Sequence, residues 1–291
     1  MFKLINILLF IFLVFTSCNK NKNTVNGFLW KIKKGDGVTY IYGANYIAKE
    51  KAILDKITKN VLKSSDIILV EFDFIKNSKI LNRLVSKNYY TKNGTLKKIL
   101  PSKLYKKVYQ KYKEYGYSDL GIDRLSLHGA AMGLKNKKYK KLGYIMNNGF
   151  YNKIINKSYE YKKKIVGFLD PETYFNHLNN ATKESQIFIL NKVLNTSNKI
   201  TKKLLQQCET YRKNGDIENF IIADRKLLYH KDLEVKLNYI IKLHITKIVD
   251  LCLKKEKKCF VLEGSTILTS KNNNIIKGLK LKGYDVERIR Y

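Results

Sequence analysis

The sequence contains little proline, glycine or cysteine. Its 2 prolines and 16 glycines among 291 residues exclude collagen-like and low-complexity chains. Its 4 cysteines form no Cys-x-x-Cys pair, so a zinc site built on cysteine is not expected. Apolar residues make up 44% of the chain, which is enough for a sizeable hydrophobic core. This length and composition predict a globular protein of one large domain or two small ones.

Acidic residues are also scarce compared with basic ones. The chain has 24 Asp and Glu against 57 Lys and Arg, for a net charge of +33. The basic residues occur in every segment, which indicates a general bias of composition more than a nucleic-acid groove. No nucleic-acid recognition motif accompanies the charge, so no specific nucleic-acid partner is predicted. Contact with polyanions or anionic lipid would still follow from the charge alone.

The longest apolar run lies at the N-terminus. Residues 4–15 are almost wholly apolar, follow a short basic start, and lead to two small residues before Cys18. A dozen or so apolar residues are too few for a comfortable membrane span and fit a signal peptide. The small residues before the cysteine resemble a bacterial lipobox. We therefore predict a lipoprotein signal peptide at 1–17, acyl chains such as palmitate on Cys18, and a tether at 18–26.

This prediction places the protein in a bacterial cell envelope, attached to a membrane through lipid on Cys18. Several acyl chains would anchor it stably, whereas one would be marginal. An ordinary cleaved signal peptide and an uncleaved anchor remain open. Lipidation would leave Cys208, Cys252 and Cys259, an odd number that makes a poor disulfide framework. Cys252 and Cys259 could approach each other, but we expect buried free thiols.

Strand patterns dominate the first part of the chain after the tether. Two β-rich runs, 27–34 and 38–43, flank the turn Gly35-Asp36-Gly37, which predicts a hairpin. A helix is expected at 49–63. The following run, 66–73, is continuous, apolar and β-branched, as in a buried central strand.

That predicted strand ends in two acids, Glu71 and Asp73. Carboxylates at the C-terminal end of a buried strand often belong to a functional site. A solvated strand end is the alternative. A second short strand, 164–168, also precedes acids, because Asp170-Pro171-Glu172 then begins a helix in which Asp170 suits the N-cap position.

The C-terminal part again reads as strand, helix and strand. The strands are expected at 258–264, running into a turn, and at 283–289, with a helix at 273–282 between them. Before them, a long amphipathic helix is expected at 232–253. It carries His244, which has no second histidine at metal-ligand spacing and is therefore interpreted as structural, as is His128.

These patterns resemble the TraB/GumN family, which includes the TIKI proteases. The N-terminal match consists of Leu29-Trp30 in the hairpin and the stretch from Ser65-Asp66 to Glu71. The first Gly-x-x-His motif of the family corresponds to Gly43 through Tyr46, so tyrosine stands at the histidine position. The second corresponds to Gly264 through Ile267, so isoleucine stands there.

Weaker matches lie in the middle of the chain. Glu172-Thr173 fit a Leu-Glu-Thr element of the family, His177 stands at a glutamine position, and Gln186 corresponds to a further glutamine. An Arg-Asn pair of the family, expected near Ile240-Ile241, is missing. The family-motif positions are thus Gly43, Tyr46, Glu71, Glu172, Gly264 and Ile267.

The resemblance implies one α+β domain at residues 27–291. Its central mixed β-sheet would be formed by the N- and C-terminal segments and covered by a helical middle region. The strands at 38–43, 67–72 and 260–263 are expected near the centre of the sheet.

The resemblance also implies metal-dependent peptide hydrolysis by two histidines and nearby acids. Ile267 has no donor atom, and the ordinary pKa of tyrosine near 10 makes phenolate ligation by Tyr46 costly. We therefore predict neither a bound metal nor another cofactor. The only catalytic candidates are Glu71 and Glu172; Asp73 and Glu263 are further acids able to serve a hard cation.

We thus predict a lipid-anchored, catalytically degenerate protein that binds a peptide or protein partner. In it, Tyr46 and Ile267 would face each other as an apolar plug, with Glu71 and Glu172 close by. One alternative is a metal-dependent peptidase with a rearranged acidic site built on Glu71 and Glu172. Another is a basic surface lipoprotein that contacts polyanions.

Overall fold

The computed structural model describes residues 28–73, 75–91, 96–167, 169–172, 182–228, 231–269 and 274–290. At 228, 231–237 and 269 it describes the backbone alone. The predicted signal peptide, Cys18 and the tether lie outside the described residues, as do Thr173 and His177.

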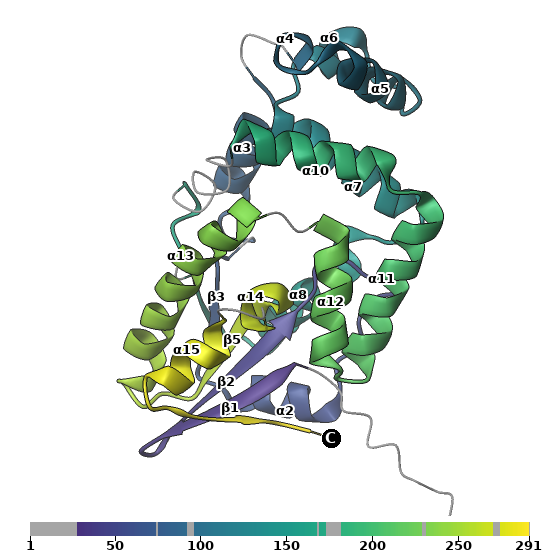
Figure 1. Ribbon diagram of the computed structural model, residues 1–291. Coiled ribbons are helices and arrows are strands. Elements are labelled where there is room, and N and C mark those ends of the chain that lie inside the picture. Colours follow the sequence, from purple (N-terminus) through teal and green to yellow (C-terminus); the bar gives the residue numbers. More distant parts are fainter. Residues whose placement is uncertain are drawn as a thin grey trace, which may run out of the picture.

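A six-stranded mixed sheet forms the centre of the protein (Figure 1). Its strand order is β4-β3-β5-β2-β1-β6. β1, β2 and β6 are joined by antiparallel pairing, whereas β2–β5, β5–β3 and β3–β4 are parallel. The strands are β1 (Leu29–Lys34), β2 (Gly37–Ala44), β3 (Ile67–Val70), β4 (Lys164–Gly167), β5 (Cys259–Gly264) and β6 (Asp285–Arg288).

This topology confirms the predicted α+β fold, in which segments from the two ends of the chain meet in one sheet. The predicted hairpin is β1–β2, and Gly35 at its tip has a φ of 54°, a backbone conformation that glycine adopts without strain. The predicted central strands are β2, β3 and β5. Their apolar runs are explained by burial on both faces of the sheet.

Helices cover each face of this sheet. On one face lie α12 (Ile217–Leu228), α13 (Lys231–Ile248), its π-helical extension η2 (Val249–Leu253) and α15 (Ile275–Leu281). They build the α13-side core, which includes Leu69, Val261 and Ile241. On the other face, α2 (Lys56–Ser64) and α8 (Phe150–Glu160) build the α8-side core, which includes Ile68 and Phe260.

The remaining described helices form a layer with its own apolar core beyond the end of the sheet (Figure 1). Its helices α7 and α5 are joined by Tyr112, whose hydroxyl donates to the Ala130 carbonyl at 2.9 Å. α11 pairs with α12 and links this layer to the sheet. The core of this layer is built by α4 (Leu96–Ile99), α5 (Ser102–Lys113), α6 (Asp119–Asp123), α7 (Leu127–Lys141) and α10 (Lys183–Asn195). Helix α3 (Ser78–Tyr89) contacts α7, α11 (Asn198–Lys213) contacts α12, and the short η1 (Met146–Asn148) precedes α8.

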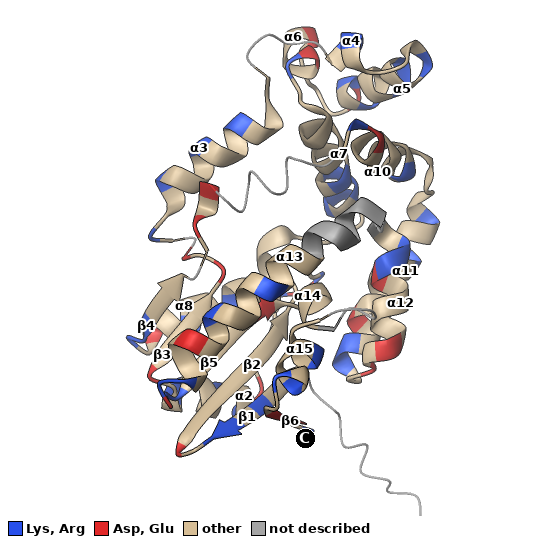
Figure 2. Cartoon of the chain, turned by 60° about the vertical axis from the view of Figure 1, so that its left-hand side comes forward, with Lys and Arg blue, Asp and Glu red and all other residues tan. Residues whose placement is uncertain are grey.

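Basic side chains lie on elements throughout the described chain (Figure 2). This distribution agrees with a general bias of composition. None of the described helices combines the length and the apolar composition that crossing a bilayer requires.

Two predicted elements differ from the structure. The helix expected from residue 49 begins only at Lys56, because the Asp55 carboxylate caps it by accepting from the Thr58 N–H at 2.7 Å. Residues 49–55 form a loop instead. The stretch after β5, expected as a turn, is the short helix α14 (Ser265–Thr269).

The prediction of free thiols was wrong for two cysteines. Cys252 and Cys259 form a disulfide, with their Cα atoms 6.0 Å apart. The π-helical end of α13 brings Cys252 opposite the first residue of β5. Cys208 is a free thiol.

Candidate functional site

Three parallel strands end at the same edge of the sheet. β3 and β5 pair Val70 with Leu262, so the next residues, Glu71 and Glu263, lie side by side there. β2 is the other neighbour of β5 and is followed by Tyr46. His244 comes from the long helix α13, which packs on one face of the sheet, and it reaches Glu263 at this edge.

These four side chains form what we call the carboxylate–histidine cluster: Tyr46, Glu71, His244 and Glu263. The Tyr46 hydroxyl donates to Glu71 Oε2 at 3.0 Å. His244 Nδ1 lies 3.0 Å from both carboxylate oxygens of Glu263. One ligand atom each of Glu71, His244 and Glu263 lies within 4.8 Å of the others.

The two carboxylates and the histidine of the cluster are buried, whereas Tyr46 is partly buried. Glu71 is 2% exposed, and His244 and Glu263 are 0% exposed. Burial raises the pKa of Glu71 to about 7; the Glu263 charge adds to this shift, while His244 and the Tyr46 hydroxyl oppose it. Glu71 therefore holds a proton for much of the time near neutral pH.

Burial alone would lower the pKa of His244, since it disfavours the imidazolium. The Glu263 carboxylate outweighs this by its charge and its hydrogen bond, helped by Glu71, and the net result is a raised pKa. The raised pKa of His244 thus favours the imidazolium beside Glu263, while the raised pKa of Glu71 favours its neutral carboxyl.

The two motif positions do not form the common apolar plug that the sequence predicted. Tyr46 packs against the α8-side core and stacks on Tyr151, with ring centroids 4.5 Å apart. Ile267 is buried in the α13-side core. The separation arises because α14 begins at Ser265, so that its first turn places Ile267 on the face of the sheet that α13 covers, opposite Tyr46.

The glycines of the two motifs, Gly43 and Gly264, differ in the space they leave for a side chain. A Cβ atom on Gly43 would lie 2.9 Å from Leu268 Cδ2 and 3.1 Å from Phe28 Cβ, so the close packing of α14 on β2 favours glycine there. A Cβ atom on Gly264 would approach no closer than 4.0 Å to Ile267 Cδ1, so no such requirement exists at the second motif.

Glu172 is not joined to Glu71. Its side chain is 55% exposed and forms an ion pair of 2.9 Å with Arg83 on α3. Asp73 accepts from the Tyr159 hydroxyl at 2.7 Å and from the backbone N–H groups of Ile75 and Lys76. Of the four acids considered from the sequence, the structure unites Glu71 and Glu263 only.

The second motif, Gly264 through Ile267, connects helices α11 and α12 to the sheet by hydrogen bonds. Ser265 accepts a hydrogen bond from Arg212 on α11 and donates to the Ala44 carbonyl at 3.0 Å. Thr266 donates to Asp224 on α12 at 2.8 Å. Arg212 also donates to the Gly43 carbonyl, so one guanidinium connects both motifs.

Arg212 is a functional candidate that the sequence did not reveal. It is 5% exposed, and its guanidinium carbon lies 4.7, 5.0 and 5.7 Å from the ring centroids of Phe28, Phe150 and Tyr42. Nothing distinguishes it locally from the many other basic residues of the chain.

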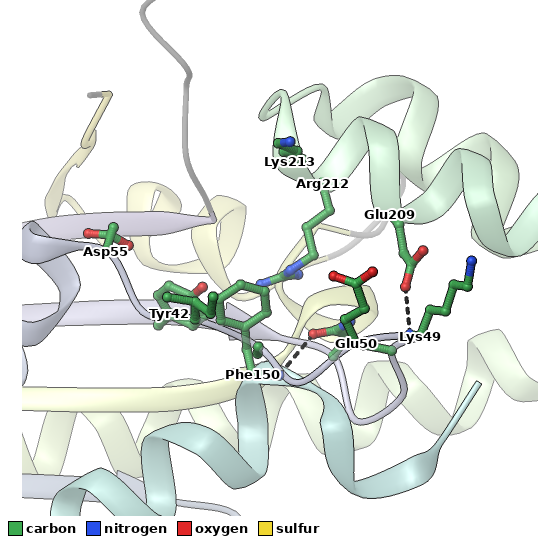
Figure 3. A pocket seen from close by; sticks show the side chains of 12 residues that line it. Tyr42, Lys49, Glu50, Asp55, Phe150, Glu209, Arg212 and Lys213 are labelled. Atoms are coloured by element: carbon green, nitrogen blue, oxygen red, sulfur yellow. Dashed lines mark hydrogen bonds between the residues drawn. The ribbon is translucent and has the colours of Figure 1, made fainter. Parts of the chain in front are cut away.

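Arg212 lines a pocket of about 420 Å³, which we call the Arg212 pocket (Figure 3). Its walls come from β2, the loop 45–55, the start of α8 and the end of α11. None of its lining residues belongs to the carboxylate–histidine cluster. They are Tyr42, Asn45, Ala48, Lys49, Glu50, Ala52, Ile53, Asp55, Phe150, Glu209, Arg212 and Lys213.

The cluster has the donor atoms of a metal site but not the access of a catalytic one. Two carboxylates and an imidazole can hold a divalent ion. A hydrolytic metal, however, keeps an open position for water or substrate. Here Glu71, His244 and Glu263 are all buried, and each is hydrogen-bonded to another residue of the cluster, so the donor atoms suit a metal ion whereas the closed surroundings do not suit catalysis by one.

Comparison with known proteins identifies the family. The model of the TraB/PrgY/gumN family matches residues 28–288, which is most of the chain. No curated protein and no solved structure matches. The protein therefore belongs to the TraB/PrgY/gumN family.

Proposed function

We propose that this protein is a catalytically degenerate family member, anchored by lipid to a membrane of the bacterial cell envelope, that binds a peptide or protein partner. One observation supports the loss of catalysis: the edge of the sheet where β2, β3 and β5 end is filled by the carboxylate–histidine cluster, whose acids and histidine are buried and hydrogen-bonded within the cluster. Tyr46, at the first motif position, is part of that cluster, and Ile267, at the second, is core.

The Arg212 pocket supports the binding role. Its volume of about 420 Å³ lies in the range of small-ligand sites. Tyr42 and Phe150 give it aromatic walls, and charged side chains from two separate parts of the chain converge on it (Figure 3). Ile53 at its rim is 82% exposed, which suits contact with an apolar group of a partner.

The disulfide supports a location outside the cytoplasm. Disulfides persist in oxidising compartments such as the periplasm and the cell surface. The buried bond between Cys252 and Cys259 is therefore consistent with export directed by residues 1–17 and with lipid on Cys18.

A peptide-retention experiment tests the binding role. Full-length protein is incubated with a defined library of short apolar peptides, and retained peptides are identified by mass spectrometry. Phe150→Ala should reduce retention, because it removes a wall of the pocket. Phe188→Ala is the matched control, since Phe188 is a half-exposed phenylalanine on α10, outside the pocket. Equal retention by wild type and Phe150→Ala would contradict the proposal.

A second candidate function is a metal-dependent hydrolase with a rearranged site. The observation in its favour is the approach of Glu71, His244 and Glu263 within 4.8 Å. A bound ion would lower the pKa of a coordinated water, and these three residues would hold it. Peptide cleavage that a chelator stops and that Glu71→Gln abolishes would favour this function over the binding role.

A further inference from the structure

The most deeply buried charge of the Arg212 pocket is positive. Arg212 is 5% exposed, whereas the other two basic lining residues, Lys49 and Lys213, lie at the surface. Its guanidinium is held from behind by the Gly43 carbonyl and the Ser265 hydroxyl, both neutral. Its position is therefore fixed by the sheet edge.

Two of the three acids that line the pocket are engaged by protein groups. Glu209 accepts from the Lys49 N–H at 2.9 Å and from the Tyr144 hydroxyl at 3.2 Å. Asp55 accepts from the N–H and the hydroxyl of Thr58 at the start of α2. Their oxygens thus serve to hold the loop 45–55 and α2 in place.

Glu50 is the remaining acid. It is exposed on the loop 45–55, and its carboxylate points toward the space in front of the Arg212 guanidinium (Figure 3). A ligand that enters would meet Glu50 at the surface before Arg212 in the interior. The sign of the effect of Glu50 on binding therefore reports the charge of the ligand.

Apart from Asn45, aromatic and aliphatic side chains make up the rest of the pocket lining. Tyr42 and Phe150 lie beside the guanidinium, and Ala48, Ala52 and Ile53 extend from them to the rim. A ligand that fills this space needs an apolar body next to its charged head. Burial of that body supplies the larger part of the binding energy, and the charged head sets the orientation.

We infer that the Arg212 pocket binds an organic anion with an apolar body, whose acidic head lies toward Arg212. This inference rests on the proposed binding function and specifies its ligand. A free carboxylic acid and the carboxyl terminus of an apolar peptide share this chemistry.

Two fluorescent probes with nearly the same aromatic skeleton test the charge preference. The anionic probe is 1-anilinonaphthalene-8-sulfonate, and the neutral one is N-phenyl-1-naphthylamine. Both are titrated into full-length protein. The anionic probe should bind saturably at one site and more tightly than the neutral one.

Charge variants then locate that site. Glu50→Gln should tighten binding of the anionic probe, and Lys213→Gln should weaken it, each about two- to fivefold, as expected for a partly screened charge. Lys33→Gln on β1 is the matched control, since it removes the same charge from an exposed side chain outside the pocket. None of these variants should change binding of the neutral probe.

Competition identifies the source of the anion. Trileucine with a free carboxyl terminus, its C-terminal amide, and decanoate compete against the bound anionic probe. Displacement by trileucine but not by its amide assigns the pocket to a peptide carboxyl terminus. Displacement by decanoate alone assigns it to a free acid.

Three results with the anionic probe would overturn the inference. They are weaker anion binding in Glu50→Gln, equal effects of Lys213→Gln and Lys33→Gln, and failure of every carboxylate to displace the probe. Saturable binding of the neutral probe alone would refute the anionic ligand and leave the proposed binding function standing. The proposed binding function is tested by a separate measurement. It fails if wild type and Phe150→Ala retain peptides equally.

Discussion

Replacing Glu71 with glutamine should remove a large part of the pH dependence of stability. The pKa of Glu71 rises from an ordinary 4.5 to about 7 on folding, chiefly because the carboxyl is buried. Folding therefore favours the protonated form. The stabilisation is fully present below pH 4.5, declines as the pH rises from 4.5 to 7, and is lost above 7.

The size of this effect follows from the shift. A difference of about 2.5 between the folded and unfolded pKa corresponds to about 3–4 kcal/mol, at about 1.4 kcal/mol for each tenfold change. His244 acts in the same direction, because its raised pKa favours the imidazolium in the folded state. Stability from His244 is present below its unfolded pKa, ordinarily 6.5, and is lost as the pH rises through the higher folded value.

Glutamine keeps the shape of Glu71 and can still accept from the Tyr46 hydroxyl, but it does not titrate. Urea unfolding between pH 4.5 and pH 8 measures the difference. Wild type should lose about 3 kcal/mol or more of unfolding free energy over this range. The Glu71→Gln variant should lose distinctly less and should be the more stable protein at pH 8.

Glu172→Gln is the matched control, because Glu172 is a half-exposed glutamate paired with Arg83 at the surface. Its removal should change stability by about 1 kcal/mol or less and should leave the pH dependence intact. The reasoning is refuted if Glu71→Gln keeps the slope of wild type, or if the stability of wild type rises with pH over this range.

Other predictions concern the core, the disulfide and the membrane anchor. Ile267→His should lower the unfolding free energy by about 2 kcal/mol or more, because it buries a polar ring in the α13-side core; a thermal midpoint equal to that of wild type would place Ile267 elsewhere. Cys252→Ala combined with Cys259→Ala should cost about 2–3 kcal/mol in urea unfolding and abolish sensitivity to reductant, whereas Cys208→Ala should do neither. Cys18→Ala should leave the precursor unprocessed or release the protein from the membrane fraction; wild-type migration and fractionation would contradict lipidation.

The sheet could be predicted because its signals are local. The glycine turn of the β1–β2 hairpin and the apolar runs of β3 and β5 each specify a strand within a few residues. The helical region was less predictable at its boundaries. The break between α10 and α11 depends on Ser197, whose side chain caps α11 through the Ile200 N–H, and such a cap is inconspicuous in a polar stretch.

The candidate site could be predicted only in part. Glu71 and Glu263 follow apolar strands, and that pattern marks them in the sequence. His244 could not be assigned, because its contact with Glu263 depends on how α13 packs across the sheet. Arg212 meets the Gly43 carbonyl across 169 residues of sequence, and no short-range pattern encodes a contact of that range.

Metal content tests the central claim that a closed carboxylate–histidine cluster has replaced metal chemistry. Full-length protein is incubated with zinc, manganese or cobalt, passed through a desalting column and analysed for bound metal, together with a Glu71→Gln sample. A parallel assay follows peptide cleavage with and without chelator. Because the cluster is buried and internally bonded, both proteins should retain the same substoichiometric metal, and no chelator-sensitive cleavage should occur. About one ion per chain that is lost in Glu71→Gln, accompanied by cleavage that the chelator stops, would contradict the account.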